Sequence, residues 1–272
     1  MNHFPATRSA TPRVLQDRLV SLARELSTRD DALALLALGS VGAETERLDA
    51  WSDLDFFVLV SEGAKRRYIG NLDWLAAVHP LVWHFQNTVD GHKALMTDGV
   101  FCEFAVFEIH ELSRIPYAPG RFIWRRNEID EALAYAKWPL PARHSADWLI
   151  GEALSNLIVG LQRHARGEKL AAMRMIQVHS LDRVLEFLEL LQSGSHDSFA
   201  ARDPFNVDRR IEMRSPQAAL ALTIWAGGYE RTVPAALALL AVLEAHDAVP
   251  ADVSGHIRML ATMAARPFHE DT

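Results

Sequence analysis

Two short segments in the first quarter of the sequence carry residues whose types and spacing suit metal and phosphate chemistry. They are residues 38–42, Leu-Gly-Ser-Val-Gly, and residues 52–58, Ser-Asp-Leu-Asp-Phe-Phe-Val. Side chains alternate between the two faces of a β-strand, so Asp53 and Asp55 would project on the same side. Carboxylates this close repel one another, and a divalent cation such as Mg²⁺, which prefers oxygen ligands, removes the conflict. The pair predicts a magnesium site. The alternative is that the two aspartates stand at the start of a strand and face water.

The small-residue turn before the aspartates favours the magnesium interpretation. Gly39 permits backbone angles closed to other residues, and Ser40 can donate its hydroxyl and its backbone N–H to a phosphate oxygen. A Gly-Ser pair alone is uninformative. Placed shortly before Asp-x-Asp, with an apolar strand pattern on each side, it predicts a phosphate-binding turn beside a metal.

The combined pattern, a hydrophobic residue, Gly39-Ser40, a spacer and then Asp53-Leu54-Asp55, resembles the signature of the nucleotidyltransferase superfamily. Members of this family transfer a nucleoside monophosphate from a nucleoside triphosphate to an acceptor. The resemblance implies that Gly39 and Ser40 bind the triphosphate and that Asp53 and Asp55 bind Mg²⁺.

The family usually has a third carboxylate on a later strand, and Glu103 is the best candidate. It lies in the otherwise apolar residues 100–107, where a glutamate without a partner would be costly to desolvate. The resemblance implies that Glu103 either completes the metal site or acts as the general base for the acceptor hydroxyl. A solvent-facing glutamate is the alternative. Glu108, at the end of this strand, falls on the opposite face from Glu103.

One residue departs from the family pattern. Members commonly carry another glycine four residues after the serine, where this chain has Glu44. We expect Gly42 to take over its role by a shifted turn, with the Glu44 side chain pointing away from the phosphates.

The elements that position these residues follow from apolar periodicity and turn signals. The first part of the chain predicts amphipathic helices and strands, with a hairpin turn at Asp98-Gly99. The helices are expected at residues 11–27 and 64–78, and the strands at 33–38, 54–60, 81–85, 92–97 and 100–107.

Proline and glycine interrupt residues 114–143, which we interpret as a linker. Long apolar-periodic segments follow, with a polar loop at 193–213. Helices are expected at residues 146–166, 170–191, 232–246 and 253–265, and from Ser215-Pro216. The predicted domains are a nucleotidyltransferase-like catalytic domain over 1–113, the linker over 114–143 and a helical bundle over 144–272. The predicted fold class is therefore an α/β (α+β) domain with a mixed sheet, followed by an all-α domain.

A helical half of this size is similar to that of the antibiotic nucleotidyltransferases, of both lincosamide and aminoglycoside types. Residues 149–170 are similar to the first bundle helix and turn of the lincosamide group, and residues 203–212 to its polar loop. An ordinary helix end and a surface loop are the alternatives.

Composition limits the partners. The net charge of −7 disfavours nucleic acid, and the absence of a long apolar run disfavours a membrane span. The single cysteine, Cys102, fits a reducing cytoplasm and is expected in the core. The histidines show no zinc spacing.

These observations predict Mg²⁺-dependent transfer of a nucleoside monophosphate, most simply AMP from ATP, to a hydroxyl of a small molecule such as an antibiotic. A monomer or a homodimer is expected. Two alternatives stay open: a non-catalytic relative that binds nucleotide or a partner, and a nucleotidyltransferase that modifies a protein or RNA.

Overall fold

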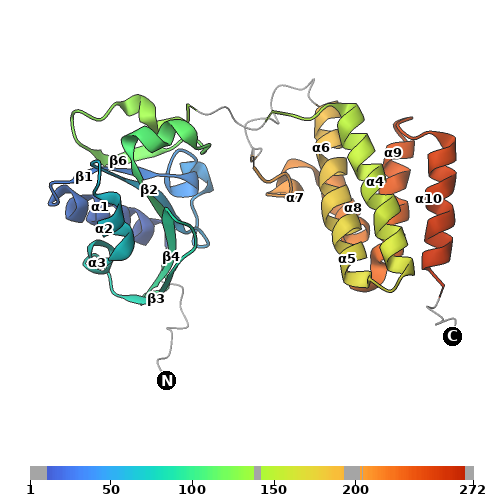
Figure 1. Cartoon of the computed structure of the whole chain (residues 1–272), viewed down its shortest axis with the longest axis horizontal. Helices are drawn as coiled ribbons and strands as arrows, with labels where there is room; N and C mark the ends of the chain where they lie inside the picture. The colour runs from blue at the N-terminus through green and yellow to red at the C-terminus, as the bar shows by residue number, and fades with distance from the viewer. Residues whose placement is uncertain (1–10, 138–141, 193–202, 204, 267–272) are drawn as a thin grey trace. The chain divides into compact units, whose positions relative to one another are not determined.

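The computed structural model describes residues 11–137, 142–192, 203 and 205–266. The chain divides into two compact units, Met1–Leu140 and Pro141–Thr272 (Figure 1). The first unit contains a sheet with helices, and the second is helical in the part described. The predicted order of an α/β half followed by a helical half is confirmed.

Unit 1 is built on a six-stranded mixed sheet with the strand order β3-β4-β5-β2-β1-β6. Strands β2 and β5 are parallel, and the other neighbouring pairs are antiparallel. The five strands predicted from the sequence are confirmed, each to within one residue. The bounds are β1 Ala32–Ala37, β2 Leu54–Val60, β3 Leu81–Gln86, β4 Gly91–Met96, β5 Phe101–Glu108 and β6 Arg121–Arg125.

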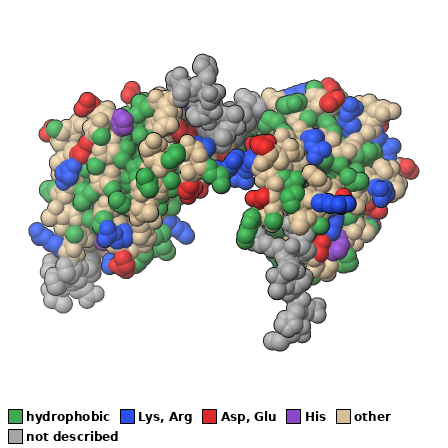
Figure 2. Space-filling model, turned by 180° about the vertical axis from the view of Figure 1, so that it is seen from behind, with side chains coloured by type: hydrophobic (Ala, Val, Ile, Leu, Met, Phe, Trp, Pro, Cys, Tyr) green, Lys and Arg blue, Asp and Glu red, His purple; other side chains and the backbone are tan. Residues whose placement is uncertain are grey.

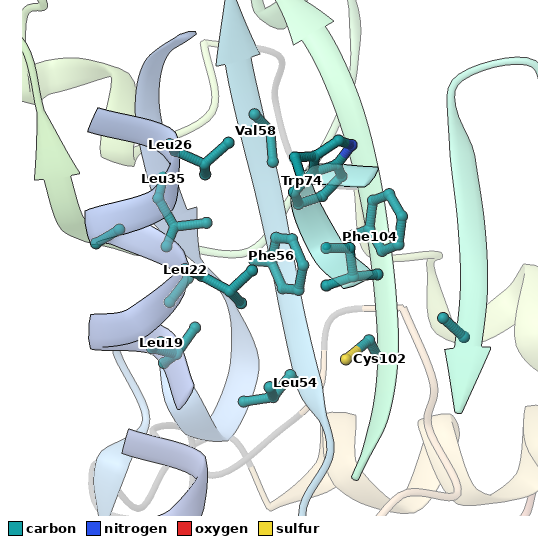
Figure 3. Close-up of a cluster of buried hydrophobic side chains, with 14 of the residues drawn as sticks. Leu19, Leu22, Leu26, Leu35, Leu54, Phe56, Val58, Trp74, Cys102 and Phe104 are labelled. Carbon is teal, nitrogen blue, oxygen red and sulfur yellow. The ribbon is translucent and has the colours of Figure 1, made fainter. Parts of the chain in front are cut away.

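Helix α1, Pro12–Ser27, covers one face of this sheet. Thr11 caps its N-terminus, and its buried leucines recur every three or four residues, as expected for an amphipathic helix. Figure 3 shows them directed at the side chains of β2 that alternate with the aspartates: Leu54, Phe56 and Val58. The carboxylates of Asp53 and Asp55 therefore belong to the other face of the sheet.

The predicted helix at 64–78 is two short helices, α2 Lys65–Gly70 and α3 Asp73–Ala76. The side chain of Asn71 accepts a hydrogen bond from the backbone N–H of Asp73, which favours a new start over continuation. Both helices contribute buried aromatic residues, Tyr68 and Trp74, to the core beneath α1.

The prediction that residues 114–143 form a linker is wrong for the part described. They contain β6, which pairs with β1 at the sheet edge, and the short helical segment η4 Glu131–Ala134. With η3 Ile109–Arg114 they pack on the second face of the sheet, over a cluster that includes Leu36, Leu59 and Tyr117. Pro116 and Pro119 precede a strand that is too short to show a clear periodicity.

Unit 2 consists of helices packed around a common apolar core. The described ones are α4 Ala146–Ala165, α5 Lys169–Arg174, η5 Met175–Ser180, α6 Leu181–Leu191, α7 Ile211–Arg214, α8 Pro216–Trp225, η7 Tyr229–Arg231, α9 Thr232–Glu244 and α10 Ala251–Ala264. The predicted helix at 170–191 is continuous but contains a π-helical segment, η5. There Gln177 exchanges two hydrogen bonds of 2.8 Å with the backbone of Gly228.

The predicted polar loop at 193–213 lies partly outside the described residues. Across the ranges that are described, no helix is long and apolar enough to cross a membrane. Acidic and basic side chains intermingle over the visible faces of both units (Figure 2).

Candidate functional site

The register of the two parallel strands brings the predicted carboxylates together. Asp55 of β2 lies directly opposite Glu103 of β5, and Leu54 lies opposite Cys102. Residues in register point to the same face, so Asp55 and Glu103 share the face away from α1, and Asp53 lies immediately before β2, two residues from Asp55. All three are partly exposed. This end of the sheet therefore presents three carboxylates to solvent or to a ligand.

The Gly-Ser turn lies beside the Asp55 carboxylate. The backbone N–H of Leu38 donates to the carbonyl of Asp55 at 2.8 Å, and the chain then enters the 3₁₀ turn η1, Gly39–Val41. Gly39 has φ +54°, and a Cβ there would be 3.4 Å from Asp55 Oδ2. The left-handed backbone favours glycine at this position, whereas the distance to the carboxylate is an ordinary contact that would admit a Cβ.

Gly42 is the second glycine that the turn requires. A Cβ at this position would lie 2.4 Å from the Ala37 carbonyl oxygen and 2.7 Å from the Leu38 Cα, both of them backbone atoms. The backbone N–H groups of Gly42 and Glu44 both donate to the carbonyl of Gly39 at 3.1 Å.

The Glu44 side chain forms an ion pair with Arg47, three residues further on. Its charge is thereby partly neutralised by a residue of the same loop. The close backbone contact of this turn falls at Gly42.

Arg121 supports the turn from β6 and has no counterpart in the sequence-based site. Its Nε donates to the Gly42 carbonyl and its Nη2 to the Val41 carbonyl, both at 3.1 Å. Because residues 114–143 read as a linker, no sequence signal pointed to this residue. A guanidinium that donates to two carbonyls fixes the outer side of the turn at residues 39–42.

Glu103 has partners on the neighbouring hairpin, although its side chain is 44% exposed and therefore remains in contact with solvent. Lys93 Nζ lies 2.9 Å from Glu103 Oε2, and Asn87 Nδ2 lies 3.4 Å from Glu103 Oε1. Lys93 is the residue of β4 in register with Glu103. Sequence reasoning missed both partners, since neither belongs to the motif.

The donor set of the site fits a hard cation such as Mg²⁺. Asp53 and Asp55, with the hydroxyl of Ser40 nearby in the chain, offer oxygen ligands, and Mg²⁺ fills its remaining positions with water or phosphate oxygens. Within the described residues, no three His, Cys, Asp or Glu side chains converge closely enough to hold a metal ion together. The two aspartates are therefore the residues that would hold it, while the Glu103 carboxylate is directed to Lys93.

Two neighbouring residues have structural roles. Glu108 accepts a hydrogen bond from the backbone N–H of Gly63 at 2.8 Å and caps η3, away from the carboxylate row. Cys102 packs in the core, as predicted, and burial raises the pKa of its thiol to about 12.

No protein-family model matches the chain, and no curated protein sequence matches it. The chain is similar to three solved structures of comparable size. An aminoglycoside 6-adenyltransferase from Bacillus subtilis is 13% identical, with a TM-score of 0.35 over 92% of this chain and 98% of that one. A nucleotidyltransferase-like protein from Exiguobacterium sibiricum is 12% identical, with a TM-score of 0.32 over 94% and 82%.

The third is a STING-associated CdnE c-di-GMP synthase from Capnocytophaga granulosa, 11% identical, with a TM-score of 0.30 over 93% and 80%. Structures named as nucleotidyltransferases are thus among those the chain is similar to. At these identities and TM-scores, the function has to be argued from the residues of the chain itself.

Proposed function

We propose that the protein is a Mg²⁺-dependent nucleotidyltransferase that moves a nucleoside monophosphate, AMP from ATP, onto a hydroxyl of a small molecule. The observation that carries the proposal is that Asp55 lies directly opposite Glu103 on the parallel strands β2 and β5, with Asp53 two residues before Asp55 and the Gly39 turn against Asp55.

In this proposal the turn holds the triphosphate. Ser40 offers a hydroxyl and a backbone N–H to phosphate oxygens, and the positive φ of Gly39 turns the backbone beside Asp55. When bound by Asp53 and Asp55, Mg²⁺ supplies positive charge that neutralises the phosphates in the transition state.

Glu103 is the proposed general base. The acceptor hydroxyl oxygen forms a bond to the α-phosphorus, the α–β phosphoanhydride bond breaks and pyrophosphate leaves, while the hydroxyl proton passes to the Glu103 carboxylate. Lys93 and Asn87 hold this carboxylate in place on β5. Of the two roles the sequence left open, the base is the one proposed, because within the described residues no third carboxylate converges with the two aspartates to hold a metal ion.

Pyrophosphate release tests the proposal. The protein is incubated with Mg²⁺ and each nucleoside triphosphate across a panel of hydroxyl-bearing acceptors that includes lincosamides and aminoglycosides. Asp53→Asn should abolish release, because it removes a metal ligand, and circular dichroism should show an unchanged fold. Asp17→Asn, on the exposed side of α1, is the matched control and should keep full activity. Activity retained by Asp53→Asn would contradict the assignment.

A further inference from the structure

The carboxylate face of the sheet continues across β4 to the edge strand β3. Phe85 of β3 lies opposite Lys93, Lys93 lies opposite Glu103, and Glu103 lies opposite Asp55. These four side chains form one row on the face that carries the proposed chemistry, because residues in register share a face.

The neighbouring row is apolar. Trp83 of β3 lies opposite Leu95 of β4, which lies opposite Phe101 of β5. Cys102 lies opposite Leu54. Phe101, one residue earlier on β5, therefore lies near Asp53, one residue before Leu54. Trp83, Phe85, Leu95 and Phe101, here called the aromatic shelf, are thus on the same face as the carboxylates.

The shelf is accessible in unit 1. Trp83 is 48% exposed and Phe85 44% exposed, with ring centroids 5.0 Å apart and planes tilted by 44°. Leu95 and Phe101 are partly exposed beside them. Large aromatic side chains rarely stand this exposed as a contiguous group unless something binds there.

The order of the strands places the shelf on the acceptor side of Glu103. The phosphate-binding turn leaves β1, on one side of β2, whereas β5, β4 and β3 follow on the other side. A triphosphate at the turn leaves Glu103 and the strands beyond it for the acceptor. Beyond Glu103 the two rows present one charged side chain, the Lys93 ammonium.

We propose that the aromatic shelf is the acceptor subsite, and that it selects a hydroxyl-bearing molecule with an apolar ring in its body over a polycation. The reacting hydroxyl lies at Glu103, and the ring packs on Trp83 and Phe85. A polyamine would meet Lys93 and hydrocarbon there instead of carboxylates. The assignment of the shelf to an acceptor rests on the proposed function, but the preference for a ring can be measured without nucleotide.

Two probes that carry the same sugar hydroxyls test the shelf: 4-nitrophenyl β-glucopyranoside, with an aromatic ring, and methyl β-glucopyranoside, without one. Their binding to the full-length protein is measured by ligand-observed NMR. The wild type should bind the nitrophenyl probe roughly tenfold more tightly. In Trp83→Ser and in Phe85→Ser, the affinity for the nitrophenyl probe should fall close to the affinity for the methyl probe.

His84→Ser is the matched control, because His84 is exposed on the same strand but faces the side that Ala94 and His92 occupy. It should retain the full preference. Equal binding of the two probes by the wild type would overturn the proposal. An equal loss of the preference for the nitrophenyl probe in all three variants would also overturn it. So would a change in sedimentation or melting of Trp83→Ser without a change in probe binding, since unit 2 or a second copy would then occupy the shelf.

Calorimetry of ATP with Mg²⁺ on the same variants separates this inference from the proposed function. All three variants should bind the nucleotide like the wild type. Absence of metal-dependent ATP binding would contradict the nucleotidyltransferase assignment, whereas loss of the ring preference alone would contradict the shelf.

Discussion

Replacing Gly42 with alanine is the sharpest test of how the turn at residues 39–42 is built. The added Cβ would lie 2.4 Å from the Ala37 carbonyl oxygen and 2.7 Å from the Leu38 Cα. Both are backbone atoms of the β1 end, and Arg121 holds the carbonyl of Gly42 from the other side. The contact cannot be relieved by a side-chain rotation, so the turn itself has to move.

The expected cost follows from this geometry. Overpacking a well-packed site costs roughly 1–3 kcal/mol, and a backbone contact belongs at the upper end of that range. We therefore expect Gly42→Ala to lower the free energy of unfolding by about 3 kcal/mol. Because the displaced turn carries Ser40, affinity for ATP with Mg²⁺ should fall by at least about tenfold.

Urea unfolding followed by tryptophan fluorescence measures the first quantity, and calorimetry the second. Gly70→Ala is the matched control, since Gly70 ends α2 and a Cβ there meets nothing within 4 Å. It should leave stability the same or raise it by up to about 1 kcal/mol, with unchanged ATP affinity. If Gly42→Ala were as stable as Gly70→Ala and bound ATP normally, the described geometry of the turn would be refuted.

Two further predictions concern the core of unit 1. Arg18 Nη2 lies 2.7 Å from Asp98 Oδ2. Burial alone would raise the Asp98 pKa, but the hydrogen bond from Arg18 and its charge outweigh burial and lower the pKa, and His79 lowers it further as a weaker influence. A lowered pKa in the folded state stabilises the protein at pH values above the unfolded pKa, which is near 4. In urea titrations, the free energy of unfolding of the wild type should exceed that of Asp98→Asn by roughly 2 kcal/mol at pH 7, and this difference should shrink as the pH falls below about 4. A difference that stays constant between pH 7 and pH 3 would contradict this. The buried Cys102 thiol, with a pKa of about 12, should react with a disulfide reagent at pH 8 only after denaturation, and rapid labelling of the native protein would show that the strand is more open than described.

The sequence predicted the central part of unit 1 well because its signals are local. Alternating apolar residues and turn residues are enough to place β2, β5 and the hairpin at Asp98-Gly99, and alternation alone puts Asp53 and Asp55 on one face. The proximity of Glu103 to Asp55 needed one further fact, the parallel register of β2 and β5, which no local pattern contains.

The parts that the sequence missed depend on contacts between distant segments. Arg121 reaches the turn only because β6 pairs with β1, and β6 is a five-residue strand that follows a segment containing Pro116 and Pro119. Lys93 is an ordinary strand lysine until the register of β4 on β5 places it against Glu103. Both residues complete the site by tertiary pairing, so neither could be found from spacing in the sequence.

Calorimetric titration of the full-length protein with ATP, in Mg²⁺ and in EDTA, tests the central claim most directly. The two aspartates and the Gly39 turn predict binding in Mg²⁺ that is lost in EDTA, and its loss in Asp53→Asn while Asp17→Asn binds normally. Equal binding in Mg²⁺ and EDTA, or an unchanged affinity in Asp53→Asn, would contradict the account of this site.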